Sequence, residues 1–480
     1  MTDRGCSRRQ LLTGGIAAAT LAGCGGGFRY TACDDPSAEA LTVRSRALPE
    51  VVPIDDAASL PEQLEHFRLG VSSGDAYPDG ATLWTRHDAD RPLAVAVWRE
   101  GMRGTAGLRV TEATGGFVHA TLGDLRPGTW YRFAFVELEG DRPVARSPLG
   151  RFRTALAPDA LEPLTVGALA CVNKHLPHDA LLNGSQLDMD LFLFLGDSAY
   201  CDGSTRICEF RQAWDATLRS EGYRALRGHQ SVLATWDDHE VTNDFDRVTA
   251  DPVQFAHGLR AFFEHQPIRR YRDAPRRIWR RRRWGRTAEI FVLDTRGERD
   301  ATSRNRPDAH IMSDAQLEWL MAGLRDSEAV FKIVMTSVPI SDFPLLFEPK
   351  SHDRWESFHA QRQRLLRFAE SLTLPGLIWV AGDFHMSSAG HVGARPGAPG
   401  WNQLEVLAGP GAQHGNPLWT VIGPPQFHYS SNTDNVTTLE LDPETVQVRV
   451  KWHAADRILG DLTYDLRHGM RLASRREPPA

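Results

Sequence analysis

The pattern of hydrophobic and polar residues changes about one third of the way along the chain. Up to about residue 157, short stretches alternate apolar and polar side chains, most clearly at residues 81–86, 93–98 and 129–136. Turn residues separate these stretches, and the stretches have no helical period. The pattern predicts short strands packed as a β-sandwich.

From about residue 164, the apolar stretches become continuous. Six of them cover residues 164–170, 190–195, 232–236, 290–293, 331–335 and 377–381. Strands that are buried on both faces of a sheet have this composition. Helix-like segments separate some of them and cover residues 209–226, 314–324 and 358–371. This part of the chain is therefore predicted to be an α/β domain.

Polar residues follow these strands at the point where each one ends. The sequences there are Gly196-Asp197-Ser198-Ala199-Tyr200, Asp237-Asp238-His239-Glu240, Asp294-Thr295-Arg296 and Gly382-Asp383-Phe384-His385. In open α/β sheets, ligands bind beyond the carboxyl ends of the strands. A single Asp at such a place is usually a turn residue. Carboxylates gathered together repel one another unless cations neutralise them, so four such ends favour a metal site.

Composition narrows the class of protein further. The 480 residues include 55 basic and 61 acidic side chains, a net charge of −6, and the basic surface typical of nucleic-acid-binding proteins is not indicated. After the first thirty residues, no apolar run is long enough for a membrane-spanning helix. The sequence contains no Gly-x-Gly-x-x-Gly after a strand, no Walker A loop and no Gly-x-Ser-x-Gly elbow, which disfavours dinucleotide-binding enzymes, P-loop NTPases and α/β-hydrolases.

Residues 1–24 have the layout of an export signal. Arg8 and Arg9 precede an apolar stretch, as in twin-arginine signals, and residues 21–24 (Leu-Ala-Gly-Cys) resemble a lipoprotein cleavage box. We expect a protein exported to the periplasm or cell surface and anchored by lipid at Cys24. An ordinary signal with a chance Cys is the alternative. Residues 25–65 are predicted to be a flexible tether.

Taken together, these motifs make the sequence resemble the alkaline phosphatase D (PhoD) family of metallophosphatases. Five motifs carry the resemblance: residues 70–86 (Gly-Val-Ser-Ser-Gly-Asp through Leu-Trp-Thr-Arg), 195–200 (Leu-Gly-Asp-Ser-Ala-Tyr), 236–244 (Trp-Asp-Asp-His-Glu-Val-Thr-Asn-Asp), 293–296 (Leu-Asp-Thr-Arg) and 382–385 (Gly-Asp-Phe-His). The resemblance implies a four-layer α/β/β/α metallophosphatase domain at residues 160–467. A small fibronectin-III-like β-sandwich at residues 66–157 would precede it, and residues 468–480 would form a disordered tail.

The resemblance also implies a centre with Fe(3+) and Ca(2+), although other divalent metals would suit the same ligands. Asp197 would bridge two metals and Tyr200 would bind iron as a phenolate, whereas a packed Tyr is the alternative. The remaining metal ligands implied are Cys171, Asp238, Asn243, Asp383 and His385. Cys171 is also a common kind of buried residue, and the chain has Ala170 where the family usually has Ser.

Two residues are predicted to act on the substrate. His239 would contact the phosphate or protonate the leaving oxygen. Arg296 would hold phosphate with its planar guanidinium, or would form a structural salt bridge with Asp294. The reaction expected is in-line attack by a metal-activated hydroxide, without a phosphorylated enzyme.

These features predict an exported metal-dependent phosphatase that hydrolyses small-molecule phosphate monoesters, and diesters as a second class. A membrane-anchored phosphodiesterase acting on lipid or wall-polymer phosphates is the first alternative, and a non-catalytic surface binding protein is the second. The only membrane contact expected is through the lipid anchor at Cys24.

Two further segments allow more than one interpretation. Residues 276–286 contain seven Arg, which we interpret as the protected edge of a hairpin, with steering of anionic substrates as the alternative. Cys201 and Cys208 could form a disulfide beside Tyr200, or could be reactive thiols or metal ligands.

Overall fold

A computed structural model describes residues 51–54, 57–102, 105–110, 115–271, 273–343, 353–416 and 426–476, without the side chains of residues 51–54 and 105–110. The predicted export signal, Cys24 and most of the predicted tether lie outside these residues. Within the described part of the chain, no helix is long and apolar enough to cross a membrane.

The larger of two central sheets has ten strands. In sheet order they are β23 (Arg471–Arg476), β22 (Ile458–Asp465), β21 (Gln447–His453), β20 (Val436–Asp442), β10 (Leu164–Leu169), β11 (Leu191–Phe194), β12 (Ser231–Ala234), β2 (Val71–Tyr77), β3 (Gly80–Arg86) and β6 (Phe117–Thr121). β10, β11, β12 and β2 run parallel, and β20 joins β10 antiparallel. The carboxyl ends of three consecutive parallel strands, β10 to β12, therefore lie at the same edge of this sheet.

The second central sheet has seven strands. In order they are β13 (Arg280–Trp284), β14 (Ala288–Val292), β15 (Phe331–Met335), β16 (Leu377–Ala381), β18 (Leu404–Leu407), β17 (Ser387–His391) and β19 (Phe427–Ser431). The strands from β14 to β16 are parallel. All six buried strands predicted from continuous apolar stretches are present in the two sheets, as β10, β11, β12, β14, β15 and β16.

Three groups of buried side chains explain how the layers pack. One core lies between the sheets and joins Leu193 of β11 to Ile333 of β15. A second joins the outer face of the ten-stranded sheet to α1 (Asp179–Gly184), α2 (Ile207–Leu218), α3 (Glu221–His229) and α4 (Pro252–His265). A third joins the outer face of the seven-stranded sheet to α5 (Asp314–Asp326) and α6 (His359–Ser371). The predicted four-layer α/β/β/α arrangement is confirmed.

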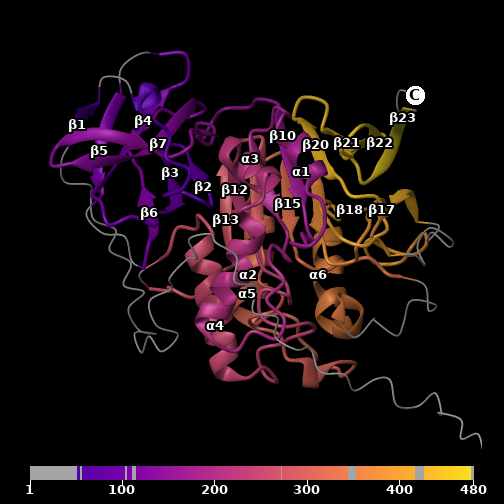
Figure 1. Cartoon of the computed structure of the whole chain (residues 1–480). Coiled ribbons are helices and arrows are strands. Elements are labelled where there is room, and N and C mark those ends of the chain that lie inside the picture. The colour runs from indigo at the N-terminus through magenta and orange to yellow at the C-terminus, as the bar shows by residue number, and fades with distance from the viewer. Residues whose placement is uncertain are drawn as a thin grey trace, which may run out of the picture.

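The predicted N-terminal sandwich is present, but it shares a sheet with the larger domain. Strands β2, β3 and β6 extend the ten-stranded sheet, because β2 pairs with β12. The facing sheet contains β1 (Val51–Ile54), β5 (Thr105–Val110), β4 (Leu93–Arg99), β7 (Trp130–Glu139) and β8 (Arg142–Arg146), with β9 (Gly150–Arg153) paired to β7. Figure 1 shows this unit on one side of the molecule and the C-terminal strands on the other. The sandwich is thus continuous with the larger domain through backbone hydrogen bonds.

Helix predictions were right where the apolar period is uninterrupted. Helices α5 and α6 match the predicted segments closely. The single helix predicted at residues 209–226 is instead the pair α2 and α3, because the Ser220 side chain accepts a hydrogen bond from the Tyr223 amide and begins a new helix. Helix α4 was not predicted, although Asp251 caps it and Pro252 occupies its first turn.

The C-terminal prediction was partly wrong. Strands β20 and β21 form a hairpin, and β22 and β23 continue the sheet beyond it. Residues 471–476 of the predicted disordered tail form β23, which pairs with β22.

The Arg-rich segment contains the predicted hairpin edge. β13 is the edge strand of the seven-stranded sheet and pairs antiparallel with β14. Its side chains alternate, so Arg280 and Arg282 are buried while Arg281 is exposed. Both buried guanidiniums pair with Asp75 of β2, at 2.7 and 3.0 Å. Two arginines of this segment therefore join the two central sheets.

Candidate metal centre

The polar residues predicted at strand ends come together in one cluster. Four groups of side chains have ligand atoms within 4.8 Å of one another: Cys171, Asp197 and His385; Asp197, Asp238 and His239; Asp237, Asp238 and Asp383; and Asp238, Asp244 and Asp353. Asp197 belongs to two of these groups and Asp238 to three. The groups are thus neighbouring parts of one site that receives residues from both central sheets.

Several residues of the cluster have a left-handed backbone. The φ angles are 59° at Cys171, 51° at Asp197, 65° at Asp383 and 50° at His385. Each non-glycine residue in this region costs on the order of 1–3 kcal/mol, and such residues concentrate at functional sites. These residues lie in the turns that follow β10, β11 and β16, and the concentration of strain there supports a functional interpretation of the cluster.

Asp197 lies at the centre of the cluster and is incompletely satisfied. Its Oδ2 lies 3.5 Å from Cys171 Sγ and 3.5 Å from the Tyr200 hydroxyl. Its Oδ1 is buried and has no hydrogen-bond partner. Burial raises the pKa of Asp197 well above its ordinary value; His239 opposes this rise, and Asp238 adds to it. An orphaned carboxylate oxygen among other acidic groups is the environment that a bound cation would satisfy.

Other acidic groups of the cluster also lack enough positive charge nearby to balance their ionised forms. Burial raises the pKa of Asp383 well above its ordinary value, and Asp237 raises it further. Burial and the neighbouring Asp197 likewise raise the pKa of the Cys171 thiol. Cations would stabilise the ionised forms of all these groups, so the donor set fits metal binding.

The donors differ across the cluster. Cys171 and His385 supply a sulfur and a nitrogen near Asp197, with the Tyr200 hydroxyl beside it. The group of Asp237, Asp238 and Asp383 offers only carboxylate oxygens. Thiolate and imidazole suit transition metals, whereas carboxylates suit calcium and magnesium. The cluster therefore has one end suited to a transition metal and one end suited to a hard divalent cation.

Tyr200 packs against His239, with ring centroids 4.1 Å apart. Burial raises the pKa of the phenol far above its ordinary value, and the charges of Asp197 and Cys171 raise it further. The structure thus places Tyr200 beside the predicted ligands and in contact with the predicted acid. Its role as an iron ligand stays a prediction.

His239 is held by a carboxylate, Asp202, that lies outside the predicted site residues. Its Nδ1 lies 2.6 Å from Oδ2 of Asp202, whose Oδ1 accepts the Asn243 amide at 2.7 Å. Because Asp202 occupies Nδ1, Nε2 is the ring nitrogen of His239 that remains for a contact with another group. The side chain of His239 is 17 % exposed, so it is partly accessible to solvent. Asp202 lies two residues after Tyr200, and this closeness to a predicted ligand was the one sign in the sequence that it belongs to the site.

Glu240 was not predicted to be a functional residue, although it lies inside the motif at residues 236–244. Its buried carboxylate accepts backbone N–H bonds from Asp197 at 3.2 Å, from Ser198 at 2.5 Å and from Asp237 at 2.8 Å. It therefore joins the loop after β11 to the loop after β12. Its contacts make it a positioning residue.

Arg296 is fully buried in an ion-pair network. Its Nε lies 2.7 Å from Asp237 Oδ1, its Nη1 lies 2.6 Å from Asp353 Oδ1, and its Nη2 contacts both carboxylates. The alternative, a side-chain salt bridge between Arg296 and Asp294, is not formed, because Arg296 donates to Asp294 through its backbone amide, at 3.2 Å, and not through its guanidinium. These contacts indicate that Arg296 holds Asp237 in position. The role of Arg296 as a phosphate clamp stays a prediction.

Two other predictions have different outcomes. Asn243 is exposed and its side-chain amide donates to Asp244 at 2.7 Å, so its role as a metal ligand stays a prediction. The considered Cys201–Cys208 disulfide is wrong, because Cys201 is a buried free thiol while Cys208 is disulfide-bonded. The thiol of Cys201 is absent from the four cation groups among the described residues.

Comparison with known proteins agrees with this architecture. A family model described as PhoD-like phosphatase matches residues 177–417, and a model of the N-terminal domain of PhoD-like phosphatases matches residues 55–156. Alkaline phosphatase D of Bacillus subtilis (strain 168) is 27 % identical over an alignment of 393 residues, and the match covers 68 % of this chain and 65 % of that protein. The matched part of the chain thus spans just under two thirds of that relative.

Solved structures share the fold. A structure of PhoD has a TM-score of 0.74 and 21 % identity, and the match covers 86 % of this chain and 92 % of that one. A purple acid phosphatase from yellow lupin (Lupinus luteus) seeds has a TM-score of 0.58 and 11 % identity, with 80 % of this chain and 71 % of that one covered. These two likenesses support the arrangement of sheets and helices.

Proposed function

Because the chain belongs to the PhoD-like phosphatase family, we propose that it is a metal-dependent hydrolase of phosphate esters. The observation that carries this proposal is the position of Asp197. Its orphaned, buried Oδ1 belongs to a carboxylate shared between the Cys171 group and the Asp238 group. A carboxylate between two sets of donors is suited to bridging two cations, the arrangement used for phosphoryl transfer to water.

The donor chemistry supports two kinds of metal. Cys171, Asp197, Tyr200 and His385 would hold a ferric ion, and the carboxylates of Asp238 and Asp383 would hold calcium. When bound, these cations would lower the pKa of water and stabilise negative charge on the phosphate oxygens. Iron and calcium are our proposal for this chain, and zinc or manganese are the alternatives that metal analysis would distinguish.

The residues of this chain would provide orientation and proton transfer. Asp202 holds the imidazole of His239 through Nδ1, so Nε2 would donate a proton to the leaving alcohol as the bond from phosphorus to that oxygen breaks. Water would form the new bond to phosphorus in the same displacement, with no phosphorylated side chain. Glu240 would fix the two loops that carry Asp197 and Asp238.

We propose phosphate monoesters as the main substrates and diesters as a second class. We also propose that residues 1–24 direct the protein through the twin-arginine pathway and that Cys24 receives a lipid anchor. The support for export and anchoring is the sequence of those residues, which precede the described part of the chain. Replacing Cys24 by Ser should release the protein from the membrane fraction.

The experiment that tests the proposed function combines metal analysis with two chromogenic substrates, a phosphate monoester and a phosphate diester. The wild-type chain should hydrolyse the monoester faster, and omission of iron or calcium should remove the activity. Asp197→Asn should lose both activity and bound metal. Asp188→Asn is the matched control, because Asp188 precedes the same strand, β11, and is 98 % exposed.

Two results would contradict the proposal. Full activity in Asp197→Asn would show that Asp197 is only a turn residue. Trapping of a phosphorylated side chain during turnover would contradict direct attack by water.

A further inference from the structure

A separate group of possible ligands, outside the four groups of the metal centre, lies in the N-terminal sandwich. It consists of His66, His87 and Glu137, whose ligand atoms are within 4.8 Å of one another. His66 precedes β2, His87 directly follows β3, and Glu137 lies on β7 in the facing sheet. The three residues therefore connect the ten-stranded sheet to the six-stranded sheet.

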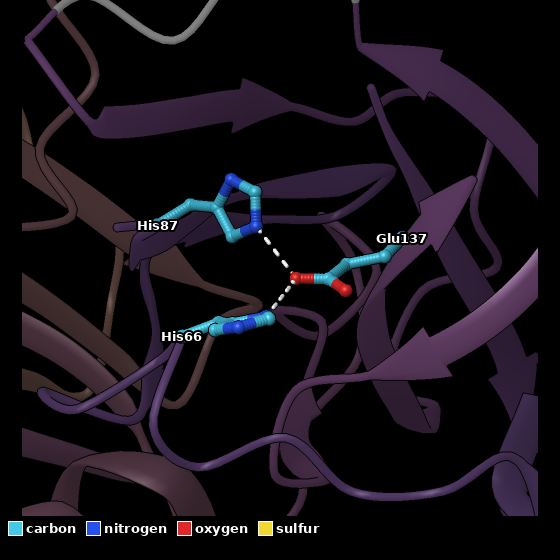
Figure 2. A group of neighbouring side chains, drawn as sticks. All are labelled: His66, His87 and Glu137. Atoms are coloured by element: carbon cyan, nitrogen blue, oxygen red, sulfur yellow. Dashed lines mark hydrogen bonds and ion pairs between the residues drawn. The ribbon is translucent and has the colours of Figure 1, made fainter. Parts of the chain in front are cut away.

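Both imidazoles approach the same oxygen of Glu137 (Figure 2). The distances to Oε1 are 2.6 Å from His66 Nδ1 and 2.8 Å from His87 Nε2. The other oxygen, Oε2, is buried and accepts no hydrogen bond. It is unusual for a buried glutamate to have two imidazole contacts on one oxygen and no hydrogen bond on the other, since buried carboxylates normally have their hydrogen-bonding capacity satisfied.

The backbone keeps the three side chains together. The amide of Asp88 donates to the carbonyl of His66 at 2.9 Å, which fixes the chain before β2 beside the end of β3. The ring of His87 packs on Phe67 with centroids 4.9 Å apart. Although burial alone would raise it, the pKa of Glu137 is lowered by its hydrogen bonds with His87 and His66. The carboxylate is therefore ionised, and two imidazole nitrogens face it in a preformed arrangement.

We propose that His66, His87 and Glu137 bind a divalent transition-metal ion of the zinc class, at a site separate from the phosphatase centre. Two imidazoles and one carboxylate form a donor set typical of such ions. On binding, His66 Nδ1 and His87 Nε2 would act as the ligand nitrogens, so any proton on either nitrogen would be released or moved to the other ring nitrogen.

The geometry requires a small adjustment. Bonds of about 2.0–2.2 Å from zinc to nitrogen and oxygen place neighbouring ligand atoms roughly 3.3 Å apart, so Glu137 would withdraw by roughly 0.5–0.7 Å. Its unused Oε2 would then be available as a further ligand atom. The side chain of His66 is 35 % exposed, which gives the ion a path from solvent and a place for a water ligand.

Arg91 is the nearby charge that opposes a cation. Its guanidinium lies 3.8 Å from Glu137 Oε2, but it also lies 3.5 Å from the exposed carboxylate of Glu139 and is itself 41 % exposed. Arg91 can therefore remain paired with Glu139 when an ion occupies the site. A bound ion would join the two sheets of the sandwich and stabilise the folded chain by mass action.

The test compares the full chain with His66→Ala, Glu137→Gln and a control, His229→Ala. His229 is a partly buried residue whose Nδ1 bonds to the Ala225 carbonyl at 2.7 Å on α3, so the control removes an imidazole outside the three-residue group. Each protein is equilibrated with Zn²⁺ and desalted, and its zinc, iron and calcium contents are measured. Zinc that enters the phosphatase centre is common to all four proteins and cancels in the comparison.

The wild type and His229→Ala should retain one more zinc ion per chain than His66→Ala and Glu137→Gln. Iron and calcium contents, and hydrolysis of the monoester, should be equal in all four proteins, which separates this site from the proposed function. Equal zinc content in all four would overturn the proposal. Glu137→Gln is nearly isosteric, so it keeps the test decisive if His66→Ala does not fold.

A titration of Arg91→Gln with Zn²⁺ gives a second, independent measurement. Removing a positive charge near the ligand oxygens should tighten zinc binding about tenfold at low salt. A hydrogen-bonded group without metal affinity would show no such gain, and unchanged zinc binding in Arg91→Gln would contradict the proposed site.

Discussion

The imidazole of His239 is oriented by Asp202, whose Oδ2 lies 2.6 Å from its Nδ1. The same carboxylate accepts the backbone amide of Asn243 through Oδ1 at 2.7 Å. Asp202 therefore fixes both the ring and the loop that follows it. A carboxylate that holds a functional His in this way sets its tautomer and its orientation.

Asp202→Asn should lower kcat for a phosphate monoester about 10- to 100-fold, the usual effect of losing a supporting carboxylate. KM should change little, because Asp202 is not expected to contact the substrate. Steady-state kinetics on metal-analysed protein would measure this split. Asp442→Asn is the control, since Asp442 accepts a backbone amide at 3.0 Å in the hairpin between β20 and β21. A rise in KM with unchanged kcat would assign Asp202 to substrate binding instead.

Tyr200→Phe should remove visible absorption from the iron-loaded protein. A phenolate bound to ferric iron gives a charge-transfer band, and phenylalanine cannot replace that ligand. The Tyr200 hydroxyl lies 3.5 Å from Asp197 Oδ2, so its loss should also weaken iron binding. Absorption spectra and iron analysis of the two proteins would measure both effects. Tyr464→Phe, a buried substitution in β22, should keep the band; an unchanged band in Tyr200→Phe would refute the assignment.

The sequence predicted those parts of the molecule that depend on local pattern. Continuous apolar stretches located β10, β11, β12 and β16, and the polar residues after β11, β12 and β16 supplied Asp197, Asp238 and Asp383. These predictions succeeded because a strand buried on both faces leaves its chemistry only at its end.

Long-range pairing could not be predicted from pattern. Asp353 follows no predicted strand, yet it pairs with Arg296 and with Arg299 at 2.7 Å. The Arg-rich segment was predicted to be a hairpin edge, but the pattern gave no sign that Arg282 pairs at 3.0 Å with Asp75, which lies 207 positions earlier in the chain. The merging of the sandwich with the larger sheet depends likewise on the pairing of β2 with β12.

Arg280→Ala should lower the free energy of unfolding by about 3 kcal/mol, because it removes the closer of the two guanidiniums that pair with the buried Asp75 carboxylate, at 2.7 Å, and leaves only Arg282. Arg281→Ala is the adjacent control. Arg281 points to the opposite side of β13, is exposed and pairs with Glu289 at 3.5 Å, so its loss should cost less than about 1 kcal/mol. Urea unfolding of the metal-loaded chains would measure the difference. Similar losses in the two variants would show that Asp75 and Arg280 do not tie the sheets together.

His453 should make the fold sensitive to acid. Burial lowers the pKa of His453 to about 4, and the neighbouring Lys451 lowers it further; its Nε2 lies 2.9 Å from the Thr438 hydroxyl. In the unfolded chain a His has a pKa of about 6.5, so between about pH 6.5 and 4 the unfolded chain binds more protons than the folded one. The stability contributed by the neutral ring is complete above this window and is lost as the pH falls through it. At pH 5 the loss should reach about 2 kcal/mol relative to pH 7.

His453→Gln cannot take up this proton, so it should lose about 2 kcal/mol less stability than the wild type between pH 7 and pH 5. His468→Gln, a change at an exposed residue, should follow the wild type. Urea unfolding of the three chains at both pH values would measure the difference, and acid release of metal is common to all three and cancels. Parallel losses in the wild type and His453→Gln would mean that folding does not lower the pKa of His453, so that the ring takes up its proton as readily in the folded chain as in the unfolded one.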